Sequence, residues 1–334
     1  MLKSILRKRV IFSVVGVLIF IISLGSAFAL WTLRERIQIF REQKIGTNLS
    51  DYPIDTRVEI QVGNTKRFYL LHIPRLYNKQ KGSPLVLAFH GGGGSAQNMK
   101  VGYDILKKSD KEWFILAFPN GSSPLKSWAL ATWNAGTCCG WSVRNQTDDV
   151  AFVRALIAQI KSEYRVSKIF VMGMSNGAMM SYRLACDAAD IIDGVGAVAG
   201  TDNTLSCNPK ETTPIMHIHA INDDHVLYYW GRGSWSISDN EPEFVSVPAT
   251  IDKWRRINSC TNVSTQVQTG TGVTCIVYND CISKSPVKLC TTDSGGHSWP
   301  GNGNKATPRS DDKEPPSQAI NATDALWSFF KGIQ

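Results

Sequence analysis

The sequence lacks the short motifs that hold the common metals and nucleotides. No C-x-x-C pair occurs among its eight cysteines, so the ligand spacing typical of a structural zinc site is missing. No G-x-G-x-x-G occurs either, and the glycine run at residues 91–94 is not followed by the Gly-Lys-Ser/Thr of a phosphate-binding loop. We therefore expect neither a metal nor another cofactor.

Excess charge of one sign is absent from most of the chain. The formal net charge is +8, but residues 1–44 contain eight basic and two acidic residues and so account for +6 of it. The remaining residues therefore carry about +2. Without a basic face the protein has no surface that would bind the phosphate backbone of a nucleic acid. We therefore expect no nucleic-acid partner.

The N-terminal segment is predicted to direct the chain out of the cytoplasm. Basic residues within positions 3–9 precede an uncharged run over residues 10–31, which is about long enough to span a bilayer. Residues 27–29 read Ala-Phe-Ala and resemble a signal-peptidase site. Two interpretations remain open for residues 1–31, a cleaved signal peptide or a retained anchor that attaches the protein to a membrane. Both make the protein secreted or periplasmic, because the positive flank stays inside.

The cysteines are expected to form disulfides, because an even number in an exported chain favours them. We expect two bridges within one group of four and two within the other, namely Cys260, Cys275, Cys281 and Cys290, and Cys138, Cys139, Cys186 and Cys207. The neighbours Cys138 and Cys139 are predicted to bond to different partners, because a ring closed between adjacent residues is strained.

After a stem over residues 32–51, the hydrophobic pattern predicts one α/β domain over residues 52–334. An alternating hairpin pattern covers residues 57–74, and the clearest helical pattern covers residues 148–164. Short, nearly continuous apolar runs are typical of strands buried on both faces, and they cover residues 84–90, 114–119, 168–172, 194–200 and 214–220. This alternation predicts a mostly parallel sheet with helices on both faces.

Ser175 is the candidate nucleophile. It lies in Gly173-Met174-Ser175-Asn176-Gly177, which matches G-x-S-x-G between an apolar run and a helical pattern. Small neighbours allow the sharp turn that lifts the serine hydroxyl clear of the sheet, and the following helix points its N-terminus at the reacting group. The alternative is an inert serine in an ordinary strand-to-helix turn.

The glycine run after the first buried strand is the candidate oxyanion hole. His90 to Ser95 read HGGGGS, and such a run lets backbone amides approach an anion closely. We expect the amides of Gly91 and Gly92 to act together with the amide of Asn176. His90 itself is expected to shape the loop.

A nucleophilic serine needs a base and an acid that orients the base. His297 is the candidate base, because it lies in a Gly-rich loop near the end of the chain. Asp223 is the candidate acid, since it follows an apolar strand; Asp224, Asp202 and, for the base, His225 are rivals. The order Ser175, Asp223, His297 is that of the α/β-hydrolases. His217 and His219 alternate within an apolar strand, where satisfied core positions are expected.

Six segments, in order, carry a resemblance to a known family: HGGGGSAQNM, WNAGTCCGW, DDVAFVRALI, VMGMSNGAMMSYRLAC, HIHAINDDHVLYYWG and GGHSWPG. Together they resemble the polyhydroxybutyrate depolymerase-like esterases, a group close to the feruloyl and acetylxylan esterases. The resemblance implies an α/β-hydrolase fold, no metal, and a secreted serine esterase. It also implies that Ser175, Asp223 and His297 are the nucleophile, acid and base. The sequence departs from the family pattern after the acid's strand, where Ala220 and Leu227 replace a glycine and a proline.

These features predict an exported carboxylic-ester hydrolase that acts by acyl transfer on hydroxyalkanoate oligo- or polyesters. The alternative is a feruloyl or acetylxylan esterase acting on plant polysaccharide, and a less favoured one is a non-catalytic binding protein on the same fold. Small or polymeric esters are the expected partners. Four residues are candidate substrate contacts: Trp133, Asn134, Tyr228 and Trp299. Trp133 has a second interpretation as an aromatic that covers the core.

Overall fold

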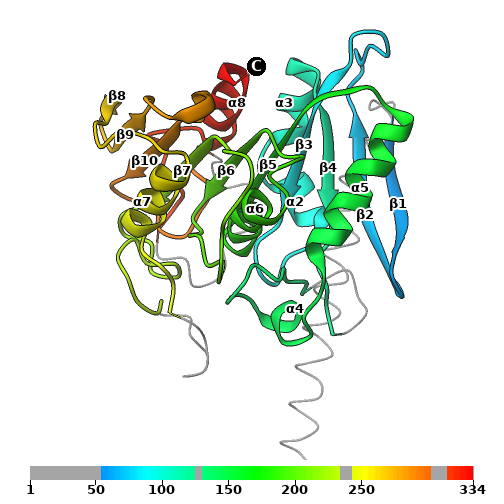
Figure 1. Ribbon diagram of the computed structural model, residues 1–334, viewed down its shortest axis with the longest axis horizontal. Coiled ribbons are helices and arrows are strands. Elements are labelled where there is room, and N and C mark those ends of the chain that lie inside the picture. The colour runs from blue at the N-terminus through cyan, green and yellow to red at the C-terminus, as the bar shows by residue number, and fades with distance from the viewer. Residues whose placement is uncertain (1–53, 125–129, 234–242, 302–313, 334) are drawn as a thin grey trace, which may run out of the picture. The chain divides into compact units, whose positions relative to one another are not determined.

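A mixed sheet of ten strands forms the centre of the computed structural model, which describes residues 54–124, 130–233, 243–301 and 314–333. The strands lie in the order β1-β2-β4-β3-β5-β6-β7-β10-β9-β8 (Figure 1). Their bounds are β1 Ile54–Val62, β2 Thr65–Ile73, β3 Ser83–Phe89, β4 Ile115–Pro119, β5 Val166–Met174, β6 Gly194–Val198, β7 Ile215–Ala220, β8 Thr265–Gly270, β9 Val273–Tyr278 and β10 Val287–Thr292.

The parallel part of the sheet lies in its middle. β4, β3, β5, β6, β7 and β10 are parallel neighbours, whereas β1–β2 and β9–β8 are antiparallel at the two edges. The five apolar runs of the sequence form β3 to β7, and the alternating segment forms the β1–β2 hairpin, as predicted. Strands buried on both faces have apolar side chains at most positions, which is why these runs are nearly continuous.

Helices cover both faces, as expected for this fold class. Successive side chains of β3 enter two different cores, Leu85 and Leu87 one of them and Val86 and Ala88 the other. The first core is covered by α5 Asp149–Glu163, α6 Asn176–Asp187 and α7 Val247–Ile257. The second is covered by α2 Ala96–Gly102, α3 Ile105–Glu112 and α8 Ala322–Gly332. Two short helices complete the described elements, α4 Gly140–Arg144 and the 3-10 helix η2 Ile282–Lys284.

The disulfides agree with one part of the expectation and correct another. Cys260 pairs with Cys281 and Cys275 with Cys290, so the C-terminal four cysteines bond among themselves as predicted. Cys186 pairs with Cys207, and Cys138 bonds to its neighbour Cys139. The prediction that the two neighbours have different partners is therefore wrong. The peptide bond between them is cis, and their Cα atoms lie 3.1 Å apart.

The N-terminal expectations fall outside the described residues. The signal peptide or anchor over residues 1–31 and the stem over residues 32–51 both precede the first described residue, Ile54. Among the helices that are described, none is both long enough and apolar enough to cross a bilayer.

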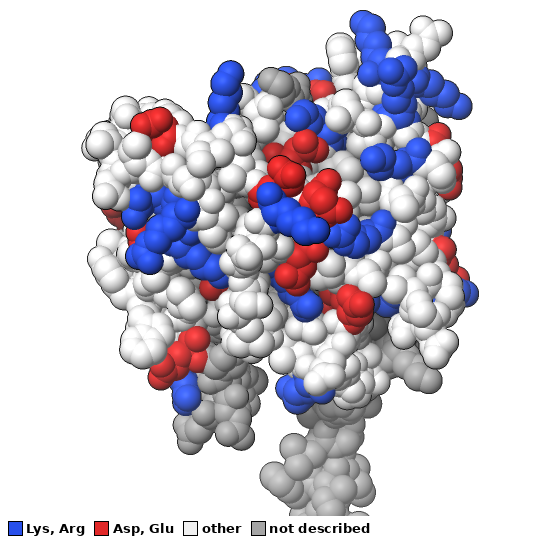
Figure 2. Space-filling view, viewed as in Figure 1, with Lys and Arg blue, Asp and Glu red and all other residues white. Residues whose placement is uncertain are grey.

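The described surface carries charges of both signs. On the face drawn in Figure 2, basic and acidic side chains lie next to each other across the middle of the molecule. Ion pairs among the described residues include Arg154 with Asp190 and Arg183 with Asp187. Exposed pairs of this kind contribute little to stability.

Candidate active site

Ser175 occupies the turn between β5 and α6. Its φ of 57° and ψ of −126° lie in a region that residues with a side chain rarely adopt. The turn requires small neighbours, because a Cβ on Gly177 would overlap the carbonyl oxygen of Phe89 and one on Gly173 would overlap the backbone of Gly177. The G-x-S-x-G spacing is thus imposed by the close approach of β3, β5 and α6.

The glycine loop after β3 lies beside this turn. A Cβ placed on Gly91 would come within 3.4 Å of the Ser175 Cβ, and one on Gly92 within 3.6 Å of the Asn176 Cβ. Within the described part of the chain, the amides of Gly91, Gly92 and Asn176 have no protein acceptor. Three donors of this kind beside a serine hydroxyl could receive a developing oxyanion.

His90 shapes the start of the glycine loop. Its Nδ1 lies 2.8 Å from the carbonyl oxygen of Gly91, and its Nε2 accepts a hydrogen bond from the amide of Gly121 at 3.0 Å. Burial lowers the pKa of His90 to about 4, so the ring is neutral and Nδ1 carries its single proton. These contacts agree with the loop-shaping part expected of this residue.

The Asp223 carboxylate is buried and held by donors on both oxygens. Its Oδ1 accepts the amides of His225 and Val226, each at 2.9 Å. Its Oδ2 lies 2.8 Å from His297 Nδ1 and 3.3 Å from His219 Nε2. Burial raises the pKa of Asp223, but the electrostatic interaction with His297 and the hydrogen bonds of His219 and His297 more than offset it, so the pKa lies well below its usual range.

His297 and Asp223 meet because their strands are neighbours. Asp223 follows β7, His297 lies in the loop after β10, and these two strands pair in parallel. The carboxyl ends of parallel strands share one edge of a sheet, where ligand sites of such folds are found. The structure therefore brings together two of the three predicted catalytic residues. Among the described residues, no hydrogen bond joins the Ser175 hydroxyl to His297, so the third contact stays a prediction.

The rivals for the acid and base have other partners. Asp202 accepts the indole N–H of Trp254 at 2.9 Å and lies 2.8 Å from Lys253 Nζ. Asp224 is partly exposed, and its Oδ1 lies 3.9 Å from His225 Nδ1. None of these contacts involves His297.

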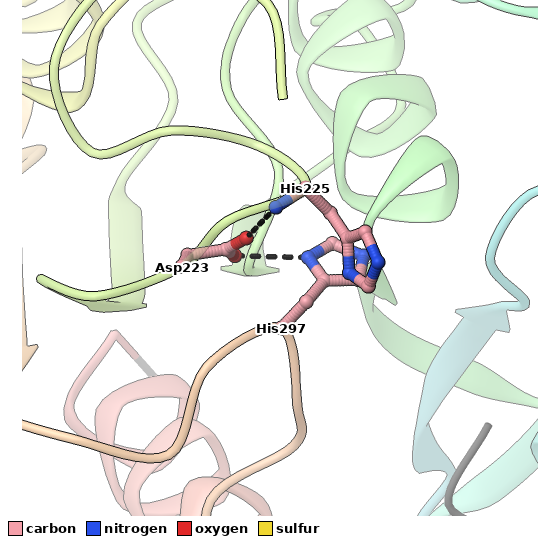
Figure 3. A group of neighbouring side chains, drawn as sticks. All are labelled: Asp223, His225 and His297. Atoms are coloured by element: carbon pink, nitrogen blue, oxygen red, sulfur yellow. Dashed lines mark hydrogen bonds and ion pairs between the residues drawn. The ribbon is translucent and has the colours of Figure 1, made fainter. Parts of the chain in front are cut away.

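His225 lies edge-on against the predicted base. The two imidazole centroids are 4.7 Å apart, and Figure 3 shows both rings beside the Asp223 carboxylate. Asp223, His225 and His297 each offer one ligand atom within 4.8 Å of the others, so that among the described residues they are a group that could hold a metal. A metal there would compete with the hydrogen bond between Asp223 and His297.

Two of the candidate substrate contacts are packed into the protein. The Trp133 side chain is fully buried, and its indole N–H donates to the carbonyl oxygen of His90 at 2.9 Å. Trp299 is also buried, with its indole N–H donating to Thr323 Oγ1. A substrate contact from either ring would need this packing to open, and for Trp133 the geometry fits the alternative of a core aromatic.

The other two candidates are half-buried. Asn134 donates its side-chain amide to the carbonyl oxygen of Thr147, and the Tyr228 hydroxyl lies 3.2 Å from Thr291 Oγ1. Their part in substrate binding stays a prediction.

The side chain of Asn176 has a function that the sequence did not indicate. Its Oδ1 accepts the backbone amide of Trp133 at 2.7 Å, and its Nδ2 donates to the carbonyl oxygen of Trp133 at 3.1 Å. This pair of bonds attaches the Trp133 loop to the start of α6, next to Ser175. No local pattern could reveal it, because the partners lie 43 residues apart.

Comparisons with known proteins bear on the fold and on the class of enzyme. No model of a known protein family matches the chain. It is 28% identical over 239 residues to feruloyl esterase B of Piromyces equi, covering 69% of this chain but only 42% of that protein. It is 24% identical to feruloyl esterase D of Neurospora crassa, covering 67% of this chain and 71% of that protein.

A solved structure supports the fold. The acetyl xylan esterase of Aspergillus awamori superposes with a TM-score of 0.55 at 13% identity, covering 84% of this chain and all of that one. The names of the two sequence relatives are those of the alternative in the sequence interpretation, feruloyl esterases. The chain is thus similar in sequence to feruloyl esterases, and its fold is that of the α/β-hydrolases.

Proposed function

We propose that this protein is a serine carboxylic-ester hydrolase that removes feruloyl or acetyl groups from plant polysaccharide. Ser175 is the nucleophile, His297 the base and Asp223 the orienting acid. The observation that carries the proposal is the 2.8 Å hydrogen bond between His297 Nδ1 and the buried Asp223 carboxylate, at the sheet edge where Ser175 occupies a strained turn.

The position of the proton on the His297 ring allows this residue to act as a base. An ionised carboxylate can only accept, so Nδ1 of His297 carries the proton and donates it to Asp223 Oδ2. The lone pair of a neutral imidazole is then on Nε2, which takes the proton of the Ser175 hydroxyl as its oxygen attacks the ester carbonyl. Asp223 stabilises the imidazolium that forms.

The amides of Gly91, Gly92 and Asn176 would then receive the oxyanion of the tetrahedral intermediate. Collapse of this intermediate expels the alcohol, which takes its proton from His297 Nε2. Water activated by the same nitrogen attacks the acyl-enzyme and releases the carboxylic acid. Each amide donor is expected to contribute on the order of 10²–10³ in turnover.

The nucleophile is tested by Ser175→Ala, with Ser162→Ala at an exposed position on α5 as the matched control. We expect Ser175→Ala to lose nearly all hydrolysis of a p-nitrophenyl acetate probe, and the control to match the unaltered protein. Substantial activity in a folded Ser175→Ala variant would disprove the assignment.

A fluorophosphonate probe separates an esterase from a binding protein on the same fold. The nucleophile is expected to form a covalent adduct at Ser175, found by mass spectrometry of the tryptic peptide. An unlabelled Ser175 in the folded protein would favour the binding alternative.

The substrate class is tested by comparing methyl ferulate, acetylated xylan and 3-hydroxybutyrate oligomers under the same conditions. The proposal predicts the highest kcat/KM on one of the two plant esters. The choice of plant esters as substrates rests on the names of the relatives, and this chain covers only 42% of the length of the first of them. A preference for the 3-hydroxybutyrate oligomers would restore the hydroxyalkanoate interpretation.

We further propose that residues 52–334 are the catalytic domain and act outside the cytoplasm. The cysteines described in the structure are all in disulfides, which persist in oxidising compartments. N-terminal sequencing of the protein recovered from cells tests whether the segment before residue 52 is cleaved or retained. A terminus after Ala29 indicates a cleaved signal peptide, and an intact N-terminus in the membrane fraction indicates an anchor.

A further inference from the structure

A row of three buried side chains leads to the Asp223 carboxylate from the core of the protein. The Tyr182 hydroxyl lies 2.7 Å from His217 Nδ1, and His217 Nε2 lies 2.9 Å from His219 Nδ1. His219 Nε2 in turn lies 2.7 Å from the carbonyl oxygen of Val226 and 3.3 Å from Asp223 Oδ2. Tyr182, His217 and His219 are at most 1% exposed.

The last acceptor determines the proton on His219 Nε2, and a neutral His219 then determines the other protons in this row. A carbonyl oxygen can only accept, so His219 must carry its proton on Nε2 to bond Val226. Neutral His219 then has a lone pair on Nδ1, which accepts Nε2–H of His217. His217 consequently accepts on Nδ1, and the donor there is the Tyr182 hydroxyl.

The surroundings keep Tyr182 and His217 neutral. Burial lowers the pKa of His217 well below its usual value and raises the pKa of Tyr182 well above its own. Neighbouring titratable side chains are Asp202, whose charge also raises the pKa of Tyr182, and Tyr228, which lies edge-on to His219. Each donor in the row therefore points toward Asp223, and hydrogen bonds in one direction polarise each other in the same sense.

We propose that Tyr182, His217 and His219 are positioning residues that hold the Asp223 carboxylate ionised and aimed at His297. His219 Nε2 and His297 Nδ1 approach the same oxygen, Oδ2, while the amides of His225 and Val226 hold Oδ1. Each oxygen of the carboxylate thus has two nitrogen neighbours that oppose its rotation. This inference rests on the proposed function, since it gives Asp223 and His297 their parts in catalysis.

The row also ties the predicted nucleophile to its acid. Tyr182 lies on α6, the helix that begins after Ser175, whereas His217 and His219 lie on β7, which leads to Asp223. The two histidine rings stack with an interplanar angle of 4°, and Tyr182 stacks on Trp254 of α7. These contacts fix the helix of the nucleophile against the strand of the acid.

The proton positions are tested first, in a way that does not depend on activity. Nuclear magnetic resonance of the full chain labelled with ¹⁵N-histidine distinguishes protonation on Nδ1 from that on Nε2. We expect neutral His217 and His219, both protonated on Nε2. A proton on Nδ1 of either ring would overturn the proposed direction, whether or not the protein is an esterase.

The effect on catalysis is tested with three variants. His219→Leu removes the donor to Asp223, His219→Gln places an amide donor near the same position, and Tyr182→Phe removes only the far hydroxyl while keeping the ring on Trp254. Tyr164→Phe, which alters a tyrosine at the end of α5, is the matched control.

In His219→Leu we expect kcat to fall roughly tenfold with KM little changed, as for one lost hydrogen bond to a charged group. The acid limb of the kcat/KM profile should move to higher pH, because the Asp223 carboxylate, having lost the His219 N–H donor, attracts the imidazolium of His297 more strongly. His219→Gln should recover part of both effects, and Tyr182→Phe should show a smaller shift in the same direction.

A purely structural part for these residues would lower the melting temperature and leave kcat and the pH profile of the folded protein unchanged. That result in folded His219→Leu would overturn the proposal. If the unaltered protein itself hydrolysed none of the ester probes, the proposed function would fail, whereas the proton positions would still be measured.

Discussion

At the residue scale, the carboxylate of Asp223 is the most heavily bonded group of the candidate site. Two backbone amides and His297 donate to it, and His219 Nε2 lies 3.3 Å away. Its neighbour Asp224 is a carboxylate of the same size on the same loop, yet it faces solvent more and lies near His225 instead. Asp223 and Asp224 are adjacent in the sequence, and they differ in how deeply they are buried and in their hydrogen-bond and ion-pair partners.

Asp223→Asn is therefore expected to disable catalysis while preserving the size of the side chain. An amide cannot hold the Nδ1 proton of His297 as a carboxylate does, so the ring can take the wrong tautomer and kcat should fall by roughly 10⁴. Steady-state hydrolysis of p-nitrophenyl acetate measures this, with Asp224→Asn as the matched control. If kcat fell in Asp224→Asn and not in Asp223→Asn, the acid would be Asp224.

The lowered pKa of His90 predicts how the stability of the protein depends on pH. Its pKa in the folded protein is lowered to about 4, below the value of about 6.5 in an unfolded chain. Between these values the unfolded chain binds more protons, so this residue makes the free energy of unfolding fall as the pH drops from about 6.5 to about 4. The stability that His90 contributes by staying neutral is fully present above about pH 6.5.

Urea unfolding of the unaltered protein and of His90→Gln at several pH values between 7.5 and 4.5 measures this contribution. Glutamine does not titrate, so the free energy of unfolding of the variant should fall less steeply across the window. Parallel pH dependences for the two proteins would contradict the neutral, buried state of His90.

At the scale of elements, the turn between β5 and α6 depends on how closely the helix approaches the sheet. Gly177 lies in the first turn of α6 against the end of β3, where a Cβ would overlap the carbonyl oxygens of Phe89 and His90. Backbone atoms cannot move aside as a flexible side chain can. The helix must shift if this position gains a methyl group.

Gly177→Ala is accordingly expected to lower both stability and activity, because α6 carries the Ser175 turn. Gly332→Ala is the matched control, since Gly332 ends α8 and a Cβ there would meet nothing within 4 Å. Thermal unfolding and ester hydrolysis of the two variants provide the comparison. A Gly177→Ala variant as stable and active as Gly332→Ala would show that the turn tolerates a larger residue.

At the scale of the whole molecule, one buried ion pair connects the hairpin edge of the sheet to the active-site loops. Arg67 of β2 lies 2.8 Å from Asp149 of α5, and both side chains are almost fully buried. The second oxygen of Asp149 accepts the backbone amide of Asn134, and Arg67 also donates to the carbonyl oxygen of Asn120. Burial raises the pKa of Asp149, and the charge of Arg67 opposes this.

Arg67→Met should lower the free energy of unfolding by about 3–5 kcal/mol, because it leaves the Asp149 carboxylate buried without its cation. The double variant Arg67→Met with Asp149→Leu removes both charges and should be more stable than the single variant. Urea denaturation of the three proteins measures this. Equal losses in the single and double variants would mean that the pair acts only through packing.

The sequence alone determined the features that depend on neighbouring residues. Nearly continuous apolar runs predicted strands β3 to β7, because a strand buried on both faces carries few polar side chains. The five-residue pattern around Ser175 predicted the strand-to-helix turn, because its glycines are required by atoms that lie a few residues away or on the adjacent strand. The sequence also predicted that the C-terminal four cysteines bond among themselves, although not which pairs form.

The tertiary structure alone decided the features that join distant parts of the chain. It placed Asp223 rather than Asp224 against His297, 74 residues away, and bonded Cys138 to Cys139. It buried Trp133 beneath the glycine loop and aligned His217 and His219 with Tyr182. Such contacts depend on the order and register of strands in the finished sheet, which periodicity within a segment does not encode.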